Sequence, residues 1–222
     1  MAQRLHQSHS PGLCIRSGKR HVRLCTQAKG GEVLSAAISG LIAVAEEKAS
    51  RKRTAEDARD GYYDMLIFHD AELDNRVRTT ASRCKEYDRE NPTAHLYATI
   101  FPEDTSAIIQ VNPMNEPAEV KKVITRLQSL GSAHPLFQMA DYLTEAVEKV
   151  NEIVPKYLDS VSQVGTTDAE LQIAKADLIR QYLHNMFEAE KMFGRNYADK
   201  LFPRLSRKSS KEDESDSGED DQ

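Results

Sequence analysis

Apolar residues recur at steps of three and four along most of the chain, which is the spacing of an amphipathic helix. The clearest stripe lies toward the C-terminus and consists of Leu171, Ala174, Leu178, Tyr182, Met186, Ala189, Phe193, Tyr197 and Leu201. It predicts a helix over 167–201. Thr167 and Glu170 form a capping box at its start, and Phe202 before Pro203 ends it, because a residue before proline avoids helical angles.

Two neighbouring stripes predict one helix over 116–163 that is bent near 131–135. The first consists of Val120, Val123, Ile124, Leu127 and Leu130, and the second of Leu136, Met139, Leu143, Val147, Val150, Val154, Tyr157, Val161 and Val164. Pro117 suits a helix start, Gly131 suits the bend, and Gly165 suits the end. Pro155 lies inside the second stripe and predicts a kink, because it has no backbone N–H to donate.

The first half of the chain carries two stripes joined by a highly charged stretch, "EEKASRKRTAEDARDGYYD" at 46–64. The stripes consist of Leu34, Ile38, Leu41 and Ala45, and then of Tyr62, Leu66, His69, Leu73, Val77, Ala81, Cys84 and Tyr87. A single helix over 32–90 would be about 90 Å long at 1.5 Å per residue, and the later helices are too short to cover it. We therefore expect a break near 50–54, giving helices 32–53 and 54–90. A continuous helix remains the alternative, since the joint has no Gly or Pro.

The segment 91–115 loses the helical period but stays apolar. Its length exceeds that of most loops in helical bundles, so we expect it to pack across the helices, with a short strand at "AIIQV" as one option. Its "YATIFP" at 97–102 also resembles "YADKLFP" at 197–203. Both follow long helices, so an internal duplication of a helical hairpin is a second hypothesis.

These elements predict an all-α fold, an antiparallel bundle of about four long helices in one domain over 31–205. The composition agrees, because Ala, Leu, Glu, Lys and Arg are abundant and only 10 of the 222 residues are Gly. No run approaches the roughly 20 apolar residues that span a bilayer, so no membrane contact is expected. The three cysteines are widely spaced and suggest neither disulfides nor a zinc site. We therefore expect the protein to be in a reducing compartment, the cytoplasm.

Charge is distributed unevenly between the two ends of the chain. Residues 1–30 contain six Lys or Arg and no acid, and residues 206–222 contain seven acids against three bases. Neither end has apolar periodicity, so both are predicted to be disordered tails. The basic tail, 1–30, is open to three further interpretations: a polyanion-binding arm, an organellar transit peptide, or an extension from a misassigned start codon.

Helical bundles can bind metal ions through Glu-x-x-His pairs on facing helices, so metal binding is the first function to consider. The sequence has no Glu-x-x-His. The weak metal candidates are His69 with Glu72 and His184 with Glu188. We expect His69 to be a hydrogen-bonded core histidine, because it lies on an apolar stripe.

Other catalytic patterns are also missing from the sequence. It has no Gly-x-Ser-x-Gly motif and no phosphate-binding Gly-rich loop, so no catalytic residue and no cofactor are predicted. Glu56, Asp60 and Asp64 share a helix face, but neighbouring arginines favour a solvated surface over a cation site.

The sequence therefore predicts a non-enzymatic helical-bundle protein that acts as an interaction or scaffold module, with self-association as one form of that role. The alternative is a metal- or small-ligand-binding four-helix bundle. The third hypothesis is polyanion binding through the basic N-terminal tail. A protein partner is expected, and nucleic acid only through that tail.

Overall fold

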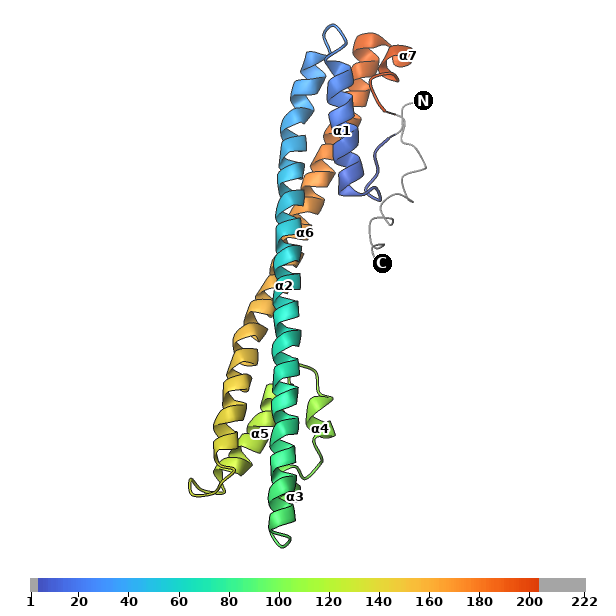
Figure 1. Ribbon diagram of the computed structural model, residues 1–222. Helices are drawn as coiled ribbons and strands as arrows, with labels where there is room; N and C mark the ends of the chain where they lie inside the picture. The colour runs from blue at the N-terminus through green and yellow to red at the C-terminus, as the bar shows by residue number, and fades with distance from the viewer. Residues whose placement is uncertain (1–3, 204–222) are drawn as a thin grey trace, which may run out of the picture. The chain divides into compact units, whose positions relative to one another are not determined.

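The computed structural model describes residues 4–203, of which 78% are helical and none lies in a strand. The prediction of an all-α fold is confirmed. Seven helices follow one another along this part of the chain (Figure 1): α1 Pro11–Cys25, α2 Glu32–Glu90, α3 Leu96–Ile100, α4 Ser106–Ile109, α5 Glu116–Gln128, α6 Gln138–Phe193 and α7 Arg195–Ala198. Two of them, α2 and α6, are far longer than the others.

Helix α2 runs for 59 residues without interruption, so the predicted break near 50–54 is wrong. The joint is fixed by ion pairs with α6 rather than by a turn. Lys48 binds Glu170 at 2.8 Å and Lys52 binds Asp168 at 2.7 Å. These basic residues thus satisfy acids on a neighbouring helix instead of capping the end of their own.

Helix α6 runs for 56 residues, from Gln138 to Phe193, through Pro155 and Gly165. The predicted boundary at 163–167 is therefore wrong, and Thr167 is buried inside the helix rather than capping a new one. The predicted end at 201 is also wrong, because Gly194 adopts a φ of 73° that favours glycine and stops the helix. The bend predicted near 131–135 is a true gap between α5 and α6.

The prediction that residues 1–30 form a disordered tail is wrong for residues 11–25, which form α1. The Ser10 side chain accepts a hydrogen bond from the Leu13 N–H at 3.3 Å, and Pro11 occupies the first turn, where its missing donor costs nothing. One face of α1 is buried through Cys14, Ile15, Ser17, Gly18, His21 and Cys25. The predicted acidic tail, 206–222, lies outside the described residues.

The apolar connection over 91–115 packs against the helices as expected, but through two short helices. The strand considered at "AIIQV" is wrong, because α4 occupies Ser106–Ile109. The Asp88 carboxylate accepts hydrogen bonds from the backbone N–H groups of Leu96 and Tyr97, at 2.7 and 2.8 Å, and so holds the start of α3. Leu96, Ile100, Phe101 and Ile108 are buried in the core.

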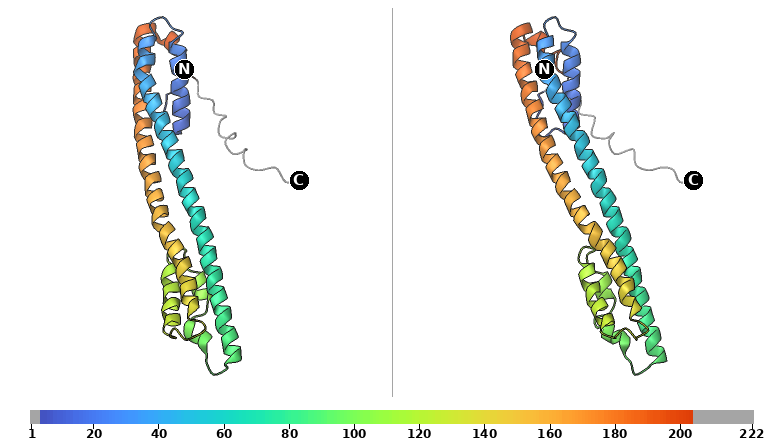
Figure 2. Two further views of the ribbon diagram at one scale, coloured as in Figure 1. Left: turned by 60° about the vertical axis from the view of Figure 1, so that its left-hand side comes forward. Right: turned by 90° about the vertical axis from the view of Figure 1, so that its left-hand side faces the viewer.

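The chain divides into two compact units rather than the single domain predicted over 31–205. Unit 1 consists of the described residues of Met1–Arg53 and Thr166–Gln222, and unit 2 is Thr54–Gly165. In unit 1, α1 packs against the first part of α2 and the last part of α6 around Ile38, Leu178 and Tyr182. In unit 2, α5 packs against the remaining parts of α2 and α6 around Leu73, Val123 and Leu143 (Figure 2).

The order of elements along the chain repeats in a way that agrees with the hypothesis of an internal duplication. The order short helix, long helix, short helix, then Phe-Pro occurs twice, first over α1–α3 and again over α5–α7. In unit 1, His21 Nδ1 of α1 donates to the Leu201 carbonyl at 2.8 Å. In unit 2, Arg126 of α5 donates to the Ile100 carbonyl at 3.0 Å. Both carbonyls directly precede Phe-Pro.

Candidate functional site

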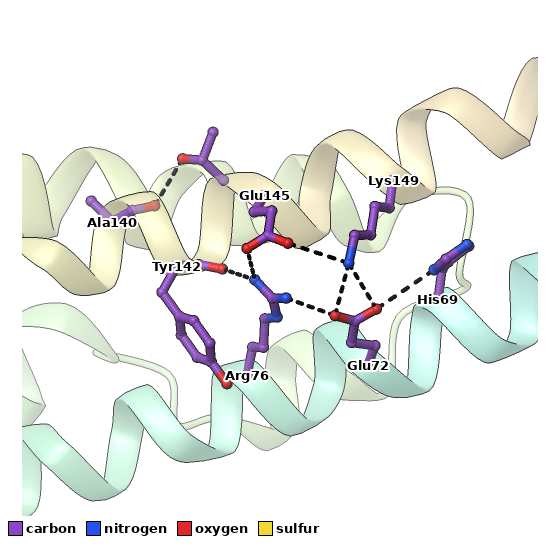
Figure 3. Close-up of polar contacts among 8 residues, drawn as sticks. His69, Glu72, Arg76, Ala140, Tyr142, Glu145 and Lys149 are labelled. Atoms are coloured by element: carbon purple, nitrogen blue, oxygen red, sulfur yellow. Dashed lines mark hydrogen bonds and ion pairs between the residues drawn. The ribbon is translucent and has the colours of Figure 1, made fainter.

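His69 and Glu72, the first pair of metal candidates, lie together on α2 in unit 2, but a network of cations surrounds Glu72 (Figure 3). The Glu72 carboxylate accepts from Arg76 at 2.7 Å and from Lys149 at 3.1 Å. His69 Nδ1 stands 3.6 Å from Glu72, beyond hydrogen-bonding distance, and no other described residue bonds it. The Lys149 ammonium therefore takes the place beside Glu72 that a metal ion would need.

Arg76 is the centre of this network and joins α2 to α6 within unit 2. Its guanidinium donates to Glu145 at 3.0 Å and to the Tyr142 carbonyl at 2.6 Å, and it lies 4.5 Å from the centre of the Tyr142 ring. The hydrogen bond from Lys149, followed by the bond from Arg76, lowers the pKa of Glu72 despite partial burial. A carboxylate held ionised in this way stabilises the helix pair and is unsuited to general acid catalysis.

His184 and Glu188, the second pair of metal candidates, lie on α6 in unit 1. His184 is exposed, and Glu188 binds Lys191 at 2.6 Å. Among residues 4–203, no three His, Cys, Asp or Glu side chains are grouped so that they could hold a metal ion. The structure thus places the two pairs in different units and gives neither pair a third ligand.

Three carboxyl groups that sequence reasoning did not connect converge where α5 begins. Glu116, at the start of α5, is 1% exposed and lies in hydrogen-bonding contact with Asp70 and Asp74 of α2. Burial, reinforced by these two acids, raises the pKa of Glu116 to about 9. Within the described residues, one oxygen of each carboxyl is buried without a hydrogen-bond partner, and protonation of Glu116 supplies a donor for one of the two aspartates.

A second buried polar cluster, in unit 1, fixes α1 and the segment after α7. His21 is fully buried, stacks on Phe202 with ring centres 4.2 Å apart, and accepts at Nε2 from the Asn185 amide at 3.0 Å. The same amide donates to the Leu34 carbonyl at 2.8 Å. Burial lowers the pKa of His21, so the neutral ring serves as a structural hydrogen-bonding group.

An exposed apolar surface of unit 2 lies on α2 and α6 beyond the N-terminus of α5. Four apolar side chains there, which we call the waist patch, are exposed by 41–50%: Tyr63, Ile67, Leu158 and Val161. Tyr63 packs on Tyr157 with ring centres 5.8 Å apart, which brings the two halves of the patch to the same level. Large side chains so exposed on two adjacent helices form an apolar patch on the surface of unit 2.

The helical phase shows that these four residues share one side of the helix pair. Tyr63 and Ile67 each follow an inward residue of α2, Tyr62 and Leu66. Leu158 and Val161 likewise follow Tyr157 and Ser160 of α6, which are half-buried and buried. One residue turns the helix by about 100°, so all four are displaced in the same sense from the buried stripe. In an antiparallel pair, residues displaced in the same sense fall on the same side.

The same level of unit 2 also carries a groove of ≈ 360 Å³. Its lining residues are Ala55, Ala58, Tyr62, Lys156, Asp159, Ser160 and Gln163. The alanine seam of the charged stretch explains the hollow, because small side chains on α2 leave space beside α6. This level of the helix pair therefore has both an apolar patch and a groove.

Among residues 4–203, no helix is both long enough and apolar enough to cross a membrane. Comparison with known proteins gives no relative from which a role could be taken: no family model matches the chain, and no similar curated protein or solved structure is found.

Proposed function

We propose that this protein is a non-enzymatic interaction or scaffold module that receives a helix of a partner on the waist patch. The observation that carries the proposal is the exposure of Tyr63, Ile67, Leu158 and Val161 on one side of two adjacent helices. Association that removes this apolar surface from water is favourable by about 25 cal/mol per Å² before the costs of binding are subtracted.

The four-helix antiparallel packing expected from the sequence takes a specific form in this proposal. At the level of the waist patch, α2 and α6 supply two helices, and α5 begins only beyond it, beside Asp70 and Asp74. A partner would supply the missing helices. A second copy of the chain would contribute two and complete a four-helix arrangement with closed two-fold symmetry.

The proposal is tested with a fluorescent, helical peptide that has a leucine face and an otherwise neutral, glutamine-rich surface. The full chain should bind this peptide, or associate with itself in sedimentation experiments, and Leu158→Ser should weaken whichever association occurs. Ile173→Ser is the matched control, because Ile173 is 65% exposed on α6 but belongs to unit 1. A chain that remains monomeric and ignores the peptide would refute the proposal.

A second candidate function, polyanion binding, is favoured by the outer face of α1. This helix has four basic residues and no acid, and Arg16, Arg20 and Arg23 are all exposed. In this version the basic N-terminal segment binds as a folded helix rather than as a disordered arm. Salt-dependent binding of RNA or DNA, lost when the three arginines are replaced by Gln, would support it. Binding unchanged by these replacements would exclude it.

A further inference from the structure

The chemistry of the partner can be read from the charges that flank the waist patch. On α2 the patch belongs to a stripe with steps of four and three, and the stripe consists of Glu56, Asp60, Tyr63, Ile67, Asp70 and Asp74. Acids thus stand at both ends of the apolar pair. Arg59 binds Asp60 at 2.6 Å, and two further bases, Lys52 and Arg53, precede Glu56 by four and three residues.

The stripe is continuous with an interface that already exists in unit 2. From Asp70 onward it is covered by α5, whose Glu116 faces Asp70 and Asp74. The residues Val120, Val123, Ile124 and Leu127 of α5 extend this contact into the core. The waist patch is the part of the same stripe that lies beyond the first residue of α5, so a second helix laid along the stripe would continue the line of α5.

The half of the surface on α6 has hydrogen-bond acceptors but no charge. The side chains on this side of α6 are Asn151, Pro155, Leu158, Val161, Ser162 and Gly165. Pro155 has no N–H, so the Asn151 carbonyl lacks the donor that a helix normally supplies four residues later. A cationic side chain on an incoming helix would meet carboxylates from α2 and this carbonyl from α6.

Unit 1 shows that such a helix fits a surface built from α2 and α6. There the helix that packs on the pair is α1, which carries four basic residues and no acid. Lys19 of α1 forms an ion pair with Glu46 of α2, while Cys14 and Ile15 enter the core. An apolar face with one basic residue beside it, Lys19, is thus already used against these two helices.

We propose that the waist patch binds a partner's amphipathic helix whose apolar face is flanked by lysine and arginine. This inference rests on the proposed function and specifies the partner's charge. Apolar contacts with Tyr63, Ile67 and Leu158 supply the binding energy, and Glu56 and Asp60 select basic over acidic helices. Because the selecting charges are near the surface, the preference weakens as salt screens them.

The test uses the full chain and three fluorescent peptides with the same leucine face, flanked by Lys, Gln or Glu. Fluorescence anisotropy at low and high salt gives the dissociation constants. We expect the Lys peptide to bind at least about tenfold more tightly than the Glu peptide, which corresponds to about 1.4 kcal/mol. The double substitution Glu56→Gln with Asp60→Asn should remove most of that preference. Leu158→Ser should weaken all the peptides together, and Ile173→Ser none of them.

The outcomes separate the two proposals. Equal binding of the Lys and Glu peptides, still sensitive to Leu158→Ser, would overturn the charge assignment and leave the interaction surface standing. Self-association through the patch that excludes every peptide would also overturn it, since the occupant would then be a second copy. Failure of all three peptides to bind a chain that stays monomeric would overturn both proposals. Circular dichroism of each variant confirms that the helices are retained.

Discussion

Raising the pH from 7 to 8.5 should destabilise unit 2 through the buried carboxyl of Glu116. Glu116 has an ordinary pKa of 4.5 when unfolded, and burial between Asp70 and Asp74 raises it to about 9 in the folded protein. Between these values the folded state keeps a proton that the unfolded state releases. The stability contributed by this proton is complete below the unfolded pKa and is lost as the pH rises toward the folded pKa.

The size of the effect follows from the width of that window. Each pH unit inside it costs about 1.4 kcal/mol, so the step from pH 7 to 8.5 should cost about 2 kcal/mol. The other shifted groups add only a smaller slope over this range, mainly because the thiols of the unfolded chain begin to ionise toward their ordinary pKa of 9.0. His21, whose pKa burial lowers below 6.5, is already neutral, and the buried thiols Cys25 and Cys84 have pKa values raised to about 11 and 12.

The assay is urea unfolding followed by circular dichroism at pH 7, 7.5, 8 and 8.5, with Glu116→Gln as the comparison. Glutamine keeps the shape and donates hydrogen bonds to Asp70 and Asp74 without a titrating proton. The variant should lose the slope and become more stable than the native chain at the upper end of the range. Equal slopes in the two proteins would show that Glu116 is ionised when folded, and the account of the carboxyl cluster would be wrong.

Four further predictions concern the remaining polar contacts. Stability should fall below pH 6.5, because the unfolded state protonates His21 while burial disfavours the charged ring in the folded state. Urea denaturation at pH 5 and 6.5 measures this fall, and His21→Gln should reduce the difference between the two pH values. Deleting residues 1–30 should lower the unfolding free energy by several kcal/mol, because each large apolar side chain lost from the core contributes roughly 1.5–3 kcal/mol. A truncated chain that melts like the native one would refute the packing of α1. Arg76→Leu should cost about 3 kcal/mol in urea unfolding, because it leaves partly buried Glu72 with one cation fewer. His69→Gln should cost less than about 1 kcal/mol by the same assay and leave the metal content of the purified protein unchanged, since His69 Nδ1 has no hydrogen bond to lose.

Hydrophobic spacing predicted those helices whose buried faces are made of large aliphatic residues. The stripe through Val120, Val123 and Leu127 located α5, and Pro117 marked its start. The same method missed α1, because apart from Ile15 its buried face consists of small and polar residues. Gly18 is an example: a Cβ there would stand 3.1 Å from the Ile42 side chain, closer than ordinary van der Waals contact, so glycine suits the close packing of α1 on α2.

The predicted break in α2 failed for a different reason, which concerns the partner helix. The expectation that shorter helices could not cover 32–90 assumed that α6 ends near Gly165, and α6 in fact continues to Phe193. Glycine inside a helix costs only about 1 kcal/mol, which the burial of Thr167 and Leu171 and the ion pairs on Asp168 and Glu170 can offset.

The site was only partly accessible from the sequence, because its members are far apart along the chain. The sequence placed His69 and Glu72 as neighbours on one helix. It could not show by spacing alone that Lys149 and Arg76 bind the Glu72 carboxylate. The carboxyl of Glu116 meets Asp70 and Asp74 only after α5 folds back on α2. Exposure of the waist patch likewise depends on where α5 begins, which sets how much of the α2 stripe it covers.

The division of the chain into units has a consequence for how the protein is made. Unit 2 is one unbroken stretch, Thr54–Gly165, and all of it is synthesised before the end of α6. Unit 1 joins the first part of the chain to the last. The apolar face of α1 is therefore translated early, whereas Leu178, Tyr182 and Phe202, which bury it, are translated at the end. During that interval the apolar face of α1 lacks the part of its core that α6 and the segment after α7 supply, and the nascent chain must keep this face from aggregating until its last segment emerges.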